Sequence, residues 1–158
     1  LEASDVKVVL TRDEDEGLYD AGADNKKVQD MKRRVEIFET SGAVLAVSIH
    51  QNSYPEEYVH GAQVFYYTGS TEGQRLAENI QSCLIQLVDR ENTRKVKAND
   101  SYYLLKKTGI PIVIAECGFL SNPQEEAKLN DSEYQKLLCC TIASVLSDFI
   151  SLDGQINA

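Results

Sequence analysis

Hydrophobic positions along this chain follow two periods, and their alternation predicts strands interleaved with helices. Short runs rich in β-branched and aromatic residues are typical of strands and occupy residues 6–10, 44–49, 61–67 and 110–115. Apolar residues at helical spacing predict helices after Lys26, after Thr71 and over residues 134–149. This order predicts an α/β fold, a single domain in which helices flank a mostly parallel sheet.

Local signals mark where two of the helices begin. Thr71 and Gln74 match the capping-box pattern, in which the side chains of the first and fourth residues each satisfy a backbone N–H. Asn122 followed by Pro123 predicts an N-cap with proline at the first helical position, and Glu125 occupies the capping-box position. These signals place a helix directly after the strand at residues 110–115.

Composition limits the classes of function that fit. The 158 residues suit one domain with a sizeable core, and the net charge of −9 argues against binding to nucleic acid, whose phosphates would repel the chain. No apolar run approaches the roughly 20 residues of a membrane span, so no transmembrane segment is expected. The four cysteines show no C-x-x-C spacing, which argues against a zinc knuckle or a thioredoxin-type site.

Each of two apolar runs is followed directly by a side chain that can bind a metal or act in acid–base catalysis. VLAVSI leads into His50, and IPIVIA leads into Glu116. The carboxyl ends of parallel strands lie along one edge of a sheet, so an imidazole and a carboxylate would meet there, as in a metal site or an acid–base pair. Burial after six apolar residues would raise the pKa of Glu116 toward the range of a general base. The alternatives are that His50 is an ordinary surface residue and that Glu116 caps the next turn.

Several segments around these two residues share a resemblance. AECGFLSNPQEE is similar to the E-x-G-F-L-[ST]-N segment of the zinc-dependent N-acetylmuramoyl-L-alanine amidases of bacterial cell walls. SIHQNS resembles the S-I-H-x-N segment of that family, and GAQVFYY resembles its G-x-x-x-[FY]-[YF] strand. VVLTR and LLKKTGIPIVIAE also fall in the family's order, so the resemblance runs from Val6 to about Phe149.

The resemblance implies a reaction and a set of roles. Enzymes of this family hold one catalytic zinc with two histidines and a glutamate, and they hydrolyse the amide between the lactyl group of N-acetylmuramic acid and L-alanine. By position, His50 corresponds to the second histidine ligand, and Glu116 corresponds to the general base that acts on zinc-activated water. Asn52 and Ser53 are weaker candidates that would orient His50 or line the substrate, and Gly118 would permit a turn.

The chain also departs from the family pattern. The family opens with a D-P-G-H-G-G-like strand that carries the first histidine ligand, and a glutamate ligand follows; neither segment is present here. The resemblance therefore implies that residues 1–158 are a catalytic domain that is partial at its N-terminus, and that the other two ligands lie upstream of Leu1. His60 does not replace them, because it lies in a loop. Zinc is thus expected in the complete protein, and the fragment alone is expected to be inactive.

Two other functions stay open from the sequence: a non-catalytic module that binds peptidoglycan or a protein, and a zinc peptidase that cuts the stem peptide. The resemblance implies peptidoglycan as substrate and an extracytoplasmic location in the bacterial cell envelope. Short members of the family include enzymes that trim the spore cortex, so sporulation is among the roles that it implies. It also suggests a protein partner that activates or localises the enzyme.

Overall fold

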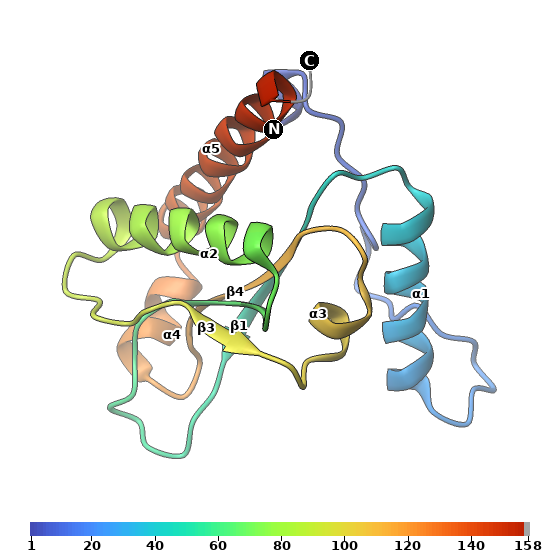
Figure 1. The fold of residues 1–158 in the computed structure, drawn as a ribbon. Coiled ribbons are helices and arrows are strands. Elements are labelled where there is room, and N and C mark those ends of the chain that lie inside the picture. Colours follow the sequence, from blue (N-terminus) through green and yellow to red (C-terminus); the bar gives the residue numbers. More distant parts are fainter. Residues whose placement is uncertain (157–158) are drawn as a thin grey trace.

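A four-stranded mixed sheet organises the chain (Figure 1). The computed structural model describes residues 1–156, with strands β1 (Ala46–Asn52), β2 (Gln63–Tyr67), β3 (Lys97–Asn99) and β4 (Ile112–Phe119). Their spatial order is β1-β4-β2-β3; β1 runs parallel to β4 and β2 to β3, whereas β2 and β4 are antiparallel. The predicted α/β domain is confirmed, with an antiparallel pair at the centre of the sheet.

Helices cover both faces of this sheet. On one face, α1 (Lys26–Thr40) and α3 (Tyr103–Lys107) enclose a core of Ala46, Phe65, Leu104, Leu105, Ile112 and Ile114. On the other face lie α2 (Thr71–Cys83), its π-helical continuation η2 (Leu84–Val88) and the long α5 (Ser132–Ile156). The larger core packs there, around Val64, Leu76, Ile80, Leu84, Val113, Ile142 and Phe149. A one-turn helix, η1 (Glu2–Ser4), and α4 (Pro123–Leu129) complete the fold.

The long helix α5 belongs to this core. Residues Ser132–Leu152 are long and apolar enough to cross a membrane by length and composition alone. In the structure, Leu138, Ile142 and Phe149 are instead buried in the cluster that α5 shares with α2 and the sheet. One face of α5 therefore packs against the rest of the chain, as in the core helix of a globular domain.

The sequence wrongly predicted a strand at residues 6–10. This segment is irregular, and two of its apolar side chains face solvent, Val9 being 45% and Leu10 66% exposed. A strand needs a neighbour to pair its N–H and C=O groups, and among residues 1–156 no strand pairs with this segment. β-branched composition alone therefore did not produce a strand.

Other differences concern where elements begin and end. β1 and β4 extend to Asn52 and Phe119, beyond the predicted ends at residues 49 and 115. The N-cap of α2 is Ser70, whose hydroxyl accepts the N–H of Gly73, and not Thr71. The short β3 lies in a stretch that the pattern left as a connector.

A β-bulge near the end of β4 reshapes its exit from the sheet. The register advances by two residues on β1, from His50 to Asn52, but by three on β4, from Glu116 to Phe119. One residue of β4 is therefore extra, and such insertions twist and redirect a strand. Gly118 lies in this bulge with φ of 156°, and a Cβ there would sit 3.3 Å from Leu129 Cδ1.

Candidate functional site

Three polar residues lie in one row across the sheet. His50 of β1 is the register partner of Glu116 of β4, and Glu116 is in turn the partner of Gln63 of β2. Because paired residues of adjacent strands direct their side chains to the same face, the imidazole and the carboxylate lie next to each other. The sequence predicted this meeting at two strand ends, but both residues lie inside their strands.

The surroundings of His50 come from β1 and α1. Its Nε2 lies 2.9 Å from the hydroxyl of Ser48, two residues earlier on the same face of the strand. Desolvation by the surrounding atoms lowers the pKa of His50, and the positive charges of Arg34 and Arg12 lower it further. Arg34 is itself paired with the buried carboxylate of Asp30 on the same helix. These groups favour a neutral imidazole, the form that can bind a metal.

The carboxylate of Glu116 is partly buried. Its Oε2 atom is buried and has no hydrogen-bond partner among the described residues. Burial raises the pKa of Glu116, as its position after an apolar run predicted. The half-buried Tyr102 packs on Phe65 with ring centroids 5.4 Å apart, and burial together with the charge of Glu116 raises the pKa of its phenol. A carboxylate with a raised pKa and an unpaired oxygen is suited to accept a proton.

The weaker candidates lie close by but make other contacts. The side-chain oxygen of Asn52 accepts the backbone N–H of Ser53, 2.8 Å away, while its backbone oxygen accepts the N–H of Leu120. In the described chain it is therefore Ser48 that lies within hydrogen-bond distance of His50. Gly118 lies in the β-bulge of β4, where its role is to allow the backbone conformation of the bulge.

Sequence reasoning missed Gln63 and Ser48, and it did not place Tyr102 near Glu116. The period-two alternation of QVFYY puts Gln63 on the same face as Phe65, but the pattern contains nothing that says β2 pairs antiparallel with β4. Ser48 could have been found, because it precedes His50 by two residues on the same strand. Tyr102 lies outside the sheet, and no local signal placed it near Glu116.

The chemistry of the donor set fits part of a metal centre. An imidazole and a carboxylate with an unpartnered, buried oxygen are zinc-compatible groups. Within the part of the chain that the structure describes, however, no three His, Cys, Asp or Glu residues cluster closely enough to hold an ion. A three-ligand catalytic site therefore needs donors beyond these residues.

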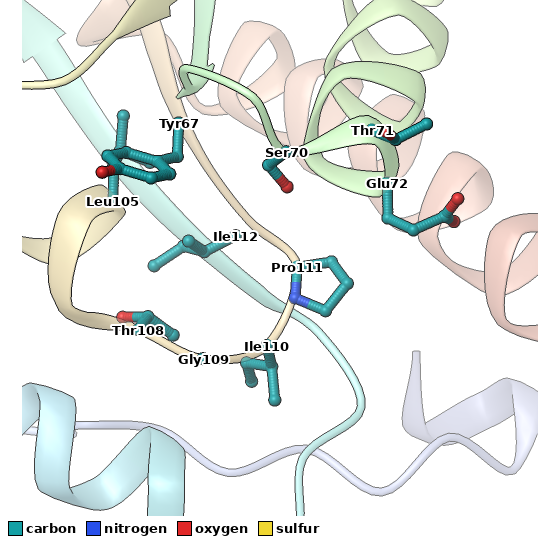
Figure 2. Close-up of a pocket in the computed structure, with 10 residues that line it drawn as sticks. All are labelled: Tyr67, Ser70, Thr71, Glu72, Leu105, Thr108, Gly109, Ile110, Pro111 and Ile112. Atoms are coloured by element: carbon teal, nitrogen blue, oxygen red, sulfur yellow. The ribbon is translucent and has the colours of Figure 1, made fainter.

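Two surface cavities lie away from this row. A hollow of about 350 Å³ opens beside the first residue of β4 and the start of α2, between Tyr67, Ser70, Thr108 and Pro111 (Figure 2). A second, of about 270 Å³, lies between the loop that ends at His60 and the segment around Arg94. The lining of neither of these two cavities includes His50 or Glu116.

The loop from β1 to β2 ends at a glycine that no other residue can replace without strain. Gly61 has φ of 96°, and a Cβ there would lie 2.7 Å from Asn92 Oδ1. We expect Gly61→Ala to lower the free energy of unfolding by about 1–3 kcal/mol, measured by urea denaturation. Gly22→Ala is the matched control, because nothing lies within 4 Å of its Cβ position. Equal stabilities for the two variants would contradict this prediction.

Comparison with known proteins identifies the family of the chain. Residues 1–148 match the family model described as N-acetylmuramoyl-L-alanine amidase. The chain is 35% identical to the germination-specific N-acetylmuramoyl-L-alanine amidase of Bacillus subtilis (strain 168) over 85% of its own length, and it spans 58% of that relative.

Two solved structures extend the comparison. The CwlD amidase of Clostridioides difficile, solved in complex with the GerS lipoprotein, superposes with a TM-score of 0.91 and 37% identity; the match covers 96% of this chain and 79% of that one. The catalytic domain of CwlV from Bacillus (Paenibacillus) polymyxa var. colistinus gives a TM-score of 0.74 and 26% identity, with 92% and 73% covered. Sequence and fold agree over nearly the whole chain, which therefore belongs to the N-acetylmuramoyl-L-alanine amidase family.

Proposed function

We propose that this chain forms most of the catalytic domain of a zinc-dependent N-acetylmuramoyl-L-alanine amidase. The observation that carries the proposal is the pairing of His50 with Glu116 on adjacent parallel strands, where Glu116 Oε2 is buried without a partner. The substrate would be peptidoglycan, cleaved at the amide between N-acetylmuramic acid and L-alanine. Membership of the family supports this choice of bond.

In this proposal His50 and Glu116 have different roles. His50 would hold the ion through one ring nitrogen, together with two further protein ligands that the described residues do not supply. Zinc, when bound, polarises a carbonyl and acidifies water. Glu116 takes a proton from the attacking water as the new C–O bond forms and delivers it to the amide nitrogen as the C–N bond breaks. The new carboxyl group gives up the remaining proton of that water to the released amine, so the products are the muramic acid carboxylate and the ammonium group of L-alanine.

Analysis of the products decides between the proposed amidase and its alternatives. The full-length protein is incubated with purified muropeptides, with and without added zinc, and the products are identified by mass spectrometry. Release of peptides that begin with L-alanine supports the amidase. Cleavage within the stem peptide would indicate a peptidase, and binding without cleavage would indicate a binding module; either result contradicts the proposal.

A histidine substitution tests the metal role separately. We expect His50→Ala in the full-length protein to reduce bound zinc by at least about tenfold, because one of three protein ligands is lost. His60→Ala is the matched control, since His60 Nδ1 lies 2.9 Å from the backbone oxygen of Tyr58 in a surface loop. Metal content by mass spectrometry is the measurement, and equal zinc in both variants would contradict the assignment of His50.

We also propose a setting for the reaction. Relatives are named as germination-specific and as probable cell wall amidases, which supports an extracytoplasmic location and a role in the spore cortex. The CwlD amidase was solved with a lipoprotein, which supports a protein partner for this chain as well. Fractionation of sporulating cells tests the location, and co-purification of the tagged full-length protein, followed by mass spectrometry, tests the partner.

A further inference from the structure

The loop between β1 and β2 has to cross the end of another strand. Because β4 lies between β1 and β2 in the sheet, residues 53–62 pass over the carboxyl end of β4 to reach β2. The loop leaves β1 two residues after His50 and re-enters the sheet at Gln63, the register partner of Glu116. Both of its ends are therefore attached to the candidate site. In Figure 1 the loop runs below α4.

Four hydrogen bonds fasten the last residue of β1 and this loop to the segment that follows Glu116. The backbone N–H of Leu120 donates to the oxygen of Asn52 over 2.8 Å, and the N–H of Tyr54 donates to the hydroxyl of Ser121 over 2.9 Å. The other two come from the helix start: Asn122 Nδ2 donates to the backbone oxygen of Glu57 over 2.8 Å, and Glu125 Oε1 accepts the N–H of Gly61 over 2.9 Å. The bonds are spread from one end of the loop to the other.

Two of these partners each make a second contact besides the one to the loop. Asn122 Oδ1 accepts the N–H groups of Gln124 and Glu125 as the N-cap of α4, which leaves its Nδ2 for the loop. The carboxylate of Glu125 reaches both the loop at Gly61 and the end of β4 at Phe119. One helix start therefore sets the position of the loop relative to Glu116.

We propose that Asn122 and Ser121 are positioning residues, which hold residues 53–61 as a fixed wall of the substrate site. The inference rests on the proposed function and adds a role for the residues after the catalytic glutamate. The loop carries two exposed aromatic residues, Tyr54 at 51% and Tyr58 at 77%, and it joins the strand of His50 to the register partner of Glu116. A fixed wall lowers the ordering cost of binding, so loosening it weakens substrate binding more than it slows bond cleavage.

The chain offers a clean probe of this role. Asn122→Asp keeps the side-chain oxygen that caps α4, because Asp and Asn cap equally well, but removes the Nδ2 donor to Glu57. Asn25→Asp is the matched control: Asn25 Oδ1 caps α1 through the N–H of Val28, and the same charge is added at a helix start away from the loop. Ser121→Ala is a second probe, which removes the acceptor of the Tyr54 N–H.

The measurements are made on the full-length protein. For Asn122→Asp and Ser121→Ala we expect amide hydrogen exchange in residues 54–59 to rise about fivefold, the effect of losing one hydrogen bond. We also expect KM for a muropeptide to rise about threefold to tenfold while kcat stays within about twofold, the signature of lost ground-state binding. Asn25→Asp is expected to change neither.

Each result bears on one proposal. Exchange in residues 54–59 equal to that of Asn25→Asp would show that the tethers do not hold the loop, and faster exchange with unchanged KM would show that the loop does not position substrate; both overturn the inference. If the wild-type protein cleaves no muropeptide, the proposed function fails. In that case, exchange and the Kd of the uncleaved muropeptide still decide the role of the loop.

Discussion

Glu116→Gln is expected to lower kcat of the full-length protein by about 10²- to 10⁴-fold, the usual contribution of a general base. The substitution keeps the shape of the side chain but removes its ability to accept a proton. Release of muropeptide fragments with zinc present is the measurement. Glu133→Gln, an exposed carboxylate in the first turn of α5, is the control and should retain full turnover. Near-normal turnover in Glu116→Gln would remove Glu116 from the role of base.

The same variant has a predictable stability, which separates lost chemistry from lost folding. Burial raises the pKa of Glu116 above 4.5, so the folded state favours its neutral form. Between that value and the raised pKa the folded protein binds more protons than the unfolded chain, so its stability falls as pH rises. Glutamine cannot ionise. Metal-free Glu116→Gln should therefore melt above the wild type at pH 8, and the difference should close toward pH 4.

Loss of activity together with a gain in stability would mark Glu116 as a residue kept for function. A buried oxygen without a partner costs about 1–3 kcal/mol, which a chain selected only for stability would avoid. A variant that is both inactive and less stable at pH 8 would instead assign Glu116 a structural role. The thermal midpoint of the metal-free protein at the two pH values distinguishes these outcomes.

The parts of the fold that depend on local signals could be predicted from the sequence. The helix at residues 26–40 and the start of α4 at Asn122 follow from periodicity and capping, which act within one turn. Long-range pairing could not be predicted in the same way. Residues 6–10 have the composition of a strand, but no strand in the described chain pairs with them. β2 enters the sheet antiparallel to β4. A short pattern contains no information about which strand lies beside it.

The residues of the candidate site differ in the same way: some could be predicted from local signals, and others depend on long-range pairing. His50 and Glu116 could be found because each follows an apolar run, and adjacent parallel strands bring them together. Gln63 could not, because it joins the row through an antiparallel pairing. Glu125 was interpreted from its spacing as a capping-box residue, but its carboxylate accepts the N–H groups of Gly61 and Phe119, whereas the N–H of the N-cap Asn122 donates to the oxygen of Phe119. Spacing identified the residue but not its partners.

The contacts of Glu125 lead to the largest expected change in stability. This side chain is only 8% exposed, and its two oxygens accept the N–H of Gly61 and the N–H of Phe119 over 2.9 and 2.8 Å. Glu125→Ala leaves both buried donors without a partner, at about 1–3 kcal/mol each. We therefore expect the free energy of unfolding to fall by about 2–6 kcal/mol in urea denaturation. Glu126→Ala, at the adjacent exposed position, should change it by less than about 0.5 kcal/mol.

An intermediate substitution shows whether both oxygens matter. Glu125→Gln keeps one acceptor but turns an NH₂ group toward one of the two N–H donors, so its loss should lie between those of the Ala variant and the wild type. This order follows only if the carboxylate joins the loop and the end of β4 at once. If Glu125→Gln were as stable as the wild type, one bond would suffice, and the loop and β4 would be held independently. A loss equal to that of Glu125→Ala would mean that the two bonds form only as a pair.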